Sequence, residues 1–131
     1  MNNSRSLDEL HPIVREKVEC FLDECDAQGI DILVTSTYRD FESQDALYAQ
    51  GRTKPGAIVT NMDGVKKKSK HNYSPSLAID IAPWPIDWKD IERFKELAEV
   101  VKKAADTVGV AIQWGGDWKT FKDWPHWEIK G

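Results

Sequence analysis

The sequence predicts an α+β fold, a small antiparallel sheet with flanking helices on one side, and three observations favour it. Two long segments carry apolar residues at the helical period, and several short segments are β-branched or alternate between apolar and polar residues. Helical and extended segments interleave without an internal repeat or a linker. The length of 131 residues is close to the commonest domain size, so we expect residues 1–131 to form a single domain.

The first half of the chain predicts a helix, a strand and a second helix. Residues Pro12 to Gln28 form an amphipathic stripe, with proline in the first turn and Gly29 just past the end. Residues Ile30 to Thr37 are apolar and β-branched, which indicates a buried strand. A helix is expected over Phe41 to Gln50, followed by an irregular stretch to about Lys70. In a small domain, so long an irregular stretch is more often functional than idle.

The second half predicts strand, helix, strand and strand. Residues Leu77 to Ala82 alternate, which leaves Asp80 as a lone carboxylate on the small-residue face. Asp87 is placed to cap a long helix that ends at Gly109. Residues 110–114 and 126–129 read as two short strands. The last of these turns Trp127 and Ile129 to one face, and His126 and Glu128 to the other.

Composition excludes several classes of protein. With 22 acidic against 18 basic residues the net charge is -4, which argues against nucleic-acid binding, and no apolar run is long enough to cross a bilayer. The first residues lack the apolar stretch of a secretory signal, so we expect synthesis in the cytoplasm. The lysine run at 66–70 reads as a solvated loop, with attraction for a polyanionic substrate as the alternative. Cys20 and Cys25 are expected to be free thiols, because their spacing places them on different faces of one helix.

The histidines are the first candidates for chemistry. His11 precedes a proline at a helix start, which is a capping or surface position. His71 and His126 each have a carboxylate nearby in the sequence. A catalytic zinc site needs three N or O ligands and one open position, and two histidines with one aspartate supply that set. Spacing alone leaves the structural alternative open, because a single histidine is more often a satisfied structural residue.

Longer strings give a more specific signal. Ser69-Lys70-His71 followed by Ala78-Ile79-Asp80 resembles the Ser-x-His…Ala-x-Asp signature of the zinc peptidases that include D-Ala-D-Ala carboxypeptidases, vancomycin-resistance dipeptidases and phage L-alanyl-D-glutamate endopeptidases. Asp123-Trp124-Pro125-His126 resembles their second signature, an acidic residue three positions before the last zinc ligand. Further matches are Thr37-Tyr38-Arg39, Gln44, Leu47, Tyr48, the residues from Gly51 to Gly56, and Trp114-Gly115-Gly116-Asp117-Trp118. Together they are similar to the phage endolysin branch.

The resemblance implies a Hedgehog/D-Ala-D-Ala-peptidase-like fold and one catalytic Zn²⁺ ion. It implies that His71, Asp80 and His126 hold the zinc and that Asp123 is the general base. Arg39 would stabilise the substrate carbonyl and its oxyanion. Arg39, Ser69 and Gln44 would bind the substrate.

Each assignment has an alternative. Asp80 would alternatively form an ion pair with a lysine. Arg39 would alternatively form a structural salt bridge. Glu128 shares a strand face with His126, which makes it an alternative base or a partner that orients the imidazole. The six tryptophans are numerous enough for a sugar-stacking surface, although we expect at least half of them to pack in the core or at its rim.

One feature departs from the family pattern. The family sets its first histidine and its aspartate seven positions apart with a glycine between them, whereas His71 and Asp80 are nine apart without glycine. Because side chains alternate along a strand, an insertion of two residues in the turn need not change the face that Asp80 occupies. We therefore expect the metal site to persist and the cleft wall to differ.

The implied function is hydrolysis of the peptidoglycan stem peptide by an L-alanyl-D-glutamate endopeptidase of the phage or prophage lysin type. The alternatives are a D,D-carboxypeptidase or D,D-dipeptidase of the same family, and a zinc-containing binding module without catalysis. We expect a monomer that binds neither nucleic acid nor membrane. It would act on the cell wall after release through a holin-type pore.

Overall fold

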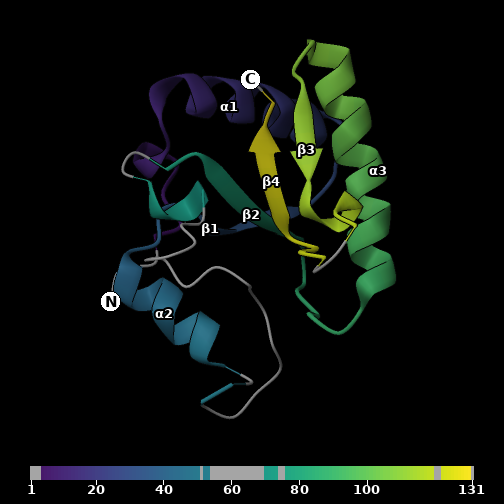
Figure 1. Cartoon of the computed structure of the whole chain (residues 1–131). Coiled ribbons are helices and arrows are strands. Elements are labelled where there is room, and N and C mark those ends of the chain that lie inside the picture. The colour runs from purple at the N-terminus through teal and green to yellow at the C-terminus, as the bar shows by residue number, and fades with distance from the viewer. Residues whose placement is uncertain (1–3, 51, 54–69, 74–75, 120–121, 131) are drawn as a thin grey trace.

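The computed structural model describes residues 4–50, 52–53, 70–73, 76–119 and 122–130 (Figure 1). Its centre is a four-stranded antiparallel sheet in the order β1-β2-β4-β3. The strands are β1 (Ile32–Ser36), β2 (Ala78–Pro83), β3 (Ile112–Trp114) and β4 (His126–Ile129). The helices are α1 (Pro12–Ala27), α2 (Phe41–Ala49) and α3 (Ile91–Val108), and the short 3₁₀ turns are η1 (Leu7–Glu9), η2 (Lys70–Asn72) and η3 (Gly115–Asp117). The predicted α+β class is confirmed.

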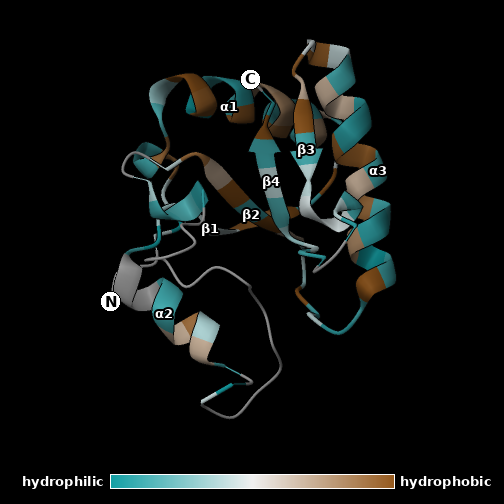
Figure 2. Cartoon of the chain, viewed as in Figure 1, coloured by the Kyte–Doolittle hydropathy of each residue, from teal (hydrophilic) through white to brown (hydrophobic). Residues whose placement is uncertain are grey.

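Two of the helices cover one face of the sheet. Figure 1 shows α1 across the top of the sheet and α3 beside β3, while α2 stands apart from both at the lower left. In Figure 2 the hydrophobic colour follows β2, whereas α1 and α3 carry both colours, as amphipathic helices do. The core between these layers includes Val18, Phe21, Ile79, Ile81, Val101 and Trp127. The expectation of helices on one side holds for α1 and α3. It does not extend to α2, whose Gln44 contacts Arg39 beside Asp80 on the polar face.

The alternation of β2 separates the core from the polar face. Ile79 and Ile81 belong to the apolar cluster, so Asp80 between them points to the opposite face. Cross-strand pairing sets Asp80 directly opposite His126 on β4 and Ser36 on β1. Residues paired in this way share a face of the sheet, so the fold brings two of the predicted ligands together.

Several element boundaries differ from those predicted. β1 is shorter than the predicted strand, and four of its five residues are only half-buried because it lies at the edge of the sheet. The cap of α3 is Asp90, whose side chain accepts a hydrogen bond from the Arg93 amide, and the prediction of Asp87 was wrong. Asp87 instead accepts from the Lys89 amide, in a turn before the helix.

Other local predictions are confirmed. His11 caps α1, since its Nδ1 accepts a hydrogen bond from the Ile13 amide. Gly29 and Gly109 follow α1 and α3 with φ of 76° and 75°, the left-handed conformation that favours glycine at helix ends. Both cysteines are free, Cys20 exposed and Cys25 buried. Within the described ranges, none of the helices has the length and apolarity needed to span a bilayer.

The buried face of β2 generates a stability prediction. Replacing the fully buried Ile81 by alanine removes contacts within the apolar cluster and leaves a cavity. We expect Ile81→Ala to lower the free energy of unfolding by about 2–5 kcal/mol, measured by urea denaturation. Ile13→Ala is the matched control, because Ile13 is 59% exposed and its truncation is expected to change stability by less than about 0.5 kcal/mol. Equal losses for the two variants would contradict this account of the core.

Candidate metal centre

His71, Asp80 and His126 converge at one point of the polar face. The Nε2 atom of His71 lies 2.9 Å from Asp80 Oδ1 and 3.2 Å from His126 Nδ1, and the last two atoms are 3.5 Å apart. A zinc ion bonded at about 2.0–2.1 Å sets tetrahedral ligands about 3.3 Å from one another. The three observed distances bracket that value, so the described residues offer a ligand set of the size that zinc requires.

The remaining nitrogen of each histidine is already engaged. His71 Nδ1 lies 2.7 Å from the carbonyl oxygen of Thr37, and His126 Nε2 lies 2.8 Å from Glu128 Oε1. If each ring donates an N–H to its oxygen, the opposite nitrogen, which faces Asp80, is the one available to a metal. Both imidazoles are thus oriented to bind a metal through the nitrogen that faces Asp80, once that nitrogen carries no proton. Glu128 lies on the far side of the ring from the ligand atoms, the position of an orienting partner.

Arg39 holds the third ligand. Its Nη2 donates to Asp80 Oδ2 at 3.2 Å and its Nη1 donates to Gln44 Oε1 at 2.8 Å, with all three side chains buried. One oxygen of Asp80 is therefore engaged by Arg39, while the other faces the histidines. This geometry agrees with the salt-bridge alternative for Arg39. Its oxyanion role and the substrate contact predicted for Gln44 stay predictions.

Asp123 lies at the open side of the cluster. Its Oδ2 is 3.8 Å from His126 Nδ1, the nitrogen that faces the other ligands. Its side chain is 29% exposed, against 4% for His126 and 11% for Asp80. Among the charged groups described around the cluster, Asp123 therefore has the most exposed side chain. Ser69 lies outside the described residues.

Burial and charge shift the protonation of these groups. Burial and the neighbouring Asp80 charge raise the pKa of Asp123 to about 7. Burial acts to lower the pKa of His126, but hydrogen bonds to Asp80 and Glu128 outweigh it and raise that pKa to about 10. Burial acts to raise the pKa of Asp80. The charge of His71 and the hydrogen bond of His126 outweigh burial and hold that pKa well below its ordinary value. Three carboxylates thus surround His126 and favour a cation there, which is the electrostatic setting of a metal site.

Comparison with known proteins identifies the family of the chain. The model of a family described as phage L-alanyl-D-glutamate peptidase matches residues 2–130. The peptidoglycan L-alanyl-D-glutamate endopeptidase CwlK of Bacillus subtilis (strain 168) is 40% identical over 129 residues, which is 92% of this chain and 74% of that protein. The chain belongs to the phage L-alanyl-D-glutamate peptidase family. The resemblance and the expectation of a hydrolase are both confirmed by this membership.

Solved structures share the fold of the peptidase. The L-Ala D-Glu endopeptidase ChiX of Serratia marcescens has a TM-score of 0.67 at 22% identity, covering 98% of this chain and 89% of that one. The vancomycin resistance D,D-pentapeptidase VanY, solved in complex with Zn(II), has a TM-score of 0.60 at 19% identity, covering 93% of this chain and 73% of that one. At these identities the likeness concerns the fold.

The longer spacing between the first two candidate ligands does not separate them. His71 lies on η2 and Asp80 on β2, yet their side chains are within hydrogen-bond distance. Asp80 lies on the polar face because its neighbours Ile79 and Ile81 face the core. The longer spacing is therefore compatible with the approach of the two side chains, and metal binding by them stays a prediction.

Sequence reasoning missed the residues that hold the ligands through the backbone. The Thr37 carbonyl binds His71, and the Ser76 hydroxyl donates to the same carbonyl at 2.9 Å. Asn72 donates to the Arg39 carbonyl at 2.8 Å. Every residue has a backbone carbonyl, so the residue type at position 37 does not predict this contact. The one sequence signal was that Thr37 belongs to Thr37-Tyr38-Arg39, a string that matches the family.

The tryptophans of the peptidase divide by burial. Trp114 and Trp127 are buried and stack on each other, and Trp118 and Trp124 are half-buried. At least half therefore pack in or around the core, as predicted. Trp84 and Trp88 are more than half exposed, and a sugar-stacking role for them stays a prediction.

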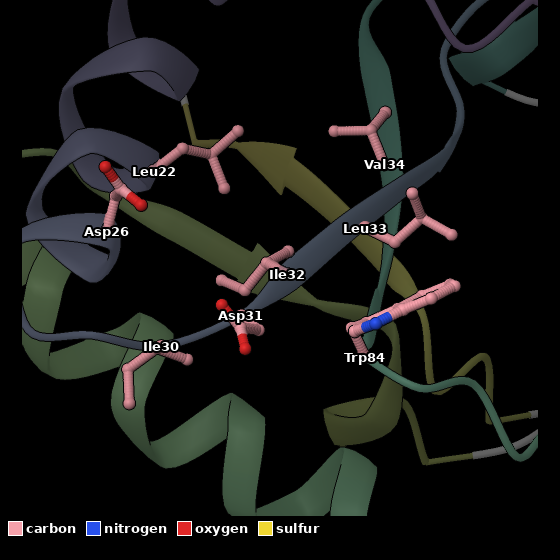
Figure 3. Close-up of a pocket in the computed structure, with 8 residues that line it drawn as sticks. All are labelled: Leu22, Asp26, Ile30, Asp31, Ile32, Leu33, Val34 and Trp84. Atoms are coloured by element: carbon pink, nitrogen blue, oxygen red, sulfur yellow. The ribbon is translucent and has the colours of Figure 1, made fainter.

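A hollow of about 550 Å³ at the outer edge of β1 is separate from this centre. Figure 3 shows its lining, with Leu22 and Asp26 from α1 on one side of the strand, and Leu33 beside Trp84 on the other. It lies toward the end of the β1–β2 ladder where Ile32 pairs with Pro83, whereas Asp80 pairs with Ser36 at the other end. The hollow contains none of the candidate ligands.

The contact between Glu128 and His126 generates a prediction about metal affinity. Glu128→Gln removes the charge that holds the imidazole, so we expect zinc affinity to fall about 10-fold, measured by competition with a chromogenic chelator. Glu96→Gln, an exposed change on α3, is the control and is expected to leave affinity unchanged. Unchanged affinity for Glu128→Gln would contradict the orienting role.

Arg39 generates a second prediction about the ligands. Arg39→Lys keeps the charge but loses the planar fork that spans Asp80 and Gln44. We expect zinc affinity to weaken by about 10–100-fold in the same competition measurement. Arg15→Lys on the surface of α1 is the matched control. If both variants bind zinc like the wild type, Arg39 does not hold Asp80 in the way described.

Proposed function

We propose that this chain hydrolyses the L-alanyl-D-glutamate bond in the stem peptide of peptidoglycan, as a single peptidase domain over residues 1–131. The observation that carries the proposal is the convergence of His71 Nε2, Asp80 Oδ1 and His126 Nδ1, with Asp123 at the open side. The activity is supported by family membership and by the same activity in the name of CwlK.

His71, Asp80 and His126 would hold one zinc ion. Zinc with three protein ligands supplies Lewis acidity and an activated water at neutral pH. The zinc complex of the VanY structure supports the choice of metal, because that protein shares this fold. The metal-free cluster would have to release the proton from His126 Nδ1 before this nitrogen binds a metal.

Asp123 would act as the general base. Its carboxylate lies on the exposed side of the ligand atoms, where it can accept a proton from the attacking water and return it to the leaving amine. Glu128 would keep His126 aligned, and Arg39 would keep one oxygen of Asp80 away from the metal. Arg39 would in addition supply positive charge near the developing oxyanion, if substrate binding frees its guanidinium. Ser69 and Gln44 would contribute to the substrate site.

We propose further that the enzyme is a monomer and reaches the wall from the cytoplasm through a holin-type pore. The phage origin in the family's name supports this route. Size-exclusion chromatography with light scattering measures the oligomeric state, and a dimer would contradict the first part.

The bond that is cut tests the activity. Zinc-loaded protein incubated with purified muropeptides is expected to yield fragments with a new amino-terminal D-glutamate, detected by mass spectrometry. Release of a terminal D-alanine alone would favour the D,D-carboxypeptidase alternative. Stoichiometric zinc without any cleavage would favour the binding module.

The base assignment has its own prediction. Asp123→Asn is expected to lower kcat by about 10²–10⁴-fold, because the general base is lost while the ligands remain. Zinc content, measured by elemental analysis, is expected to stay at one ion per chain. The control is Asp106→Asn, an exposed change on α3 that is expected to keep full activity. Wild-type activity in Asp123→Asn would refute the mechanism.

A further inference from the structure

We propose that Gly115 is a positioning residue that sets the approach of Asp123 to the metal ligands, an inference that rests on the proposed role of Asp123. Gly115 is the first residue of η3 and directly follows β3. It lies in the string from Trp114 to Trp118, which the site described above does not otherwise use.

The space beside Gly115 is already filled by the Asp123 turn. A Cβ atom at Gly115 would lie 2.3 Å from the carbonyl oxygen of Asp123, and 3.0 Å from the Cβ atoms of Asp123 and His126. The backbone of Gly115 lies outside the left-handed region, so conformational freedom is not what this position requires. The requirement is steric, because only a residue without a side chain lets the two segments come this close.

The two segments are also joined by hydrogen bonds. The Asp123 amide donates to the Gly115 carbonyl at 3.1 Å, and the His126 amide donates to the Asp123 carbonyl at 3.3 Å. The latter bond closes the turn that leads into β4. A Cβ at Gly115 would therefore collide with the carbonyl that fixes the distance between the base and the last ligand.

Gly115 also holds Trp118, whose ring lies beside His126. Its carbonyl accepts a second hydrogen bond, from the Trp118 amide at 3.3 Å. The Trp118 ring lies with its centroid 5.0 Å from that of His126. One carbonyl thus ties both Asp123 and Trp118 to the end of β3. Lys122 reinforces the loop by donating to the carbonyls of Gly116 and Trp118.

The size of the expected effect follows from the distances. Relief of a 2.3 Å contact to ordinary van der Waals separation requires a shift of the Asp123 backbone by roughly 1 Å. A misplacement of about 1 Å in catalytic geometry lowers the rate by about 100-fold. Gly115→Ala should therefore impair the chemical step without removing any side chain of the centre.

The adjacent Gly116 differs in what surrounds it. A Cβ at Gly116 would lie 2.3–2.5 Å from three atoms of the Trp114 ring, a buried core side chain. Its substitution strains the packing of the core rather than the Asp123 turn. Gly109 is a milder comparison, because its Cβ would meet nothing within 4 Å, although φ of 75° disfavours alanine.

A double-mutant cycle tests whether Gly115 acts through Asp123. We expect Gly115→Ala to lower kcat about 100-fold on a muropeptide substrate, with KM changed less than about threefold. In the Asp123→Asn background, the same substitution should lower the residual rate by less than about threefold, because the displaced group no longer acts as a base. Multiplicative losses in the double variant would overturn the proposal.

Two further measurements separate positioning from unfolding and from metal loss. Gly109→Ala should lower the melting temperature while keeping kcat, which shows what a loss of stability alone does to the rate. Zinc bound to Gly115→Ala, measured by chelator competition, should stay within about threefold of the wild-type affinity. A collapse of zinc affinity would assign Gly115 to the ligand His126 instead, and would also overturn the proposal.

A crystal structure of Gly115→Ala tests the displacement of Asp123 directly, without an activity assay. Asp123 should be displaced from β3 by roughly 1 Å relative to the wild type, even if no muropeptide is cleaved. An unmoved Asp123 would overturn the proposal. Full activity of Asp123→Asn alone would instead refute the proposed base, and with it any action of Gly115 through that residue.

Discussion

The antiparallel pairing of β2 with β4 is the constraint on which the rest of the centre depends. It sets Asp80 opposite His126, although 46 positions of the chain separate them. Because the two residues are cross-strand partners, their side chains leave the same face of the sheet close together. Ile79, Ile81 and Trp127 leave the other face and are buried by the helices. The apolar alternation that forms the core therefore also orients the ligands.

The centre concentrates charge in a buried region of the described chain. Asp80 is held by Arg39 through one oxygen and faces two imidazoles with the other. Burial of such groups is unfavourable unless each is paired, and truncation of one partner leaves another unpaired. The network thus positions the side chains of the centre and contributes little to the free energy of folding. The free energy that keeps it assembled comes from the apolar layer between the sheet and the helices α1 and α3.

Backbone carbonyl groups also hold residues of the centre in place. The Thr37 carbonyl sets the tautomer of His71, and the Gly115 carbonyl binds the amide of Asp123. Both groups belong to segments next to strands, β1 in the first case and β3 in the second. The inner pair of strands therefore carries Asp80 and His126, and the residues that directly follow the outer strands supply the backbone supports.

The sequence by itself determined the α+β class, the approximate positions of the helices, and the identity of the residues that converge. Periodicity and capping residues are local properties, and the strings around His71, Asp80 and Asp123 carry the resemblance in residue types alone. Only the tertiary structure decided that β1 is an edge strand, that Asp90 caps α3, that Arg39 pairs with Asp80, and that Glu128 lies behind His126. These depend on which segments meet in space. A hydrogen bond to a carbonyl, or a glycine with no room for a Cβ, is a relation between distant parts of the chain, and neither part shows it alone.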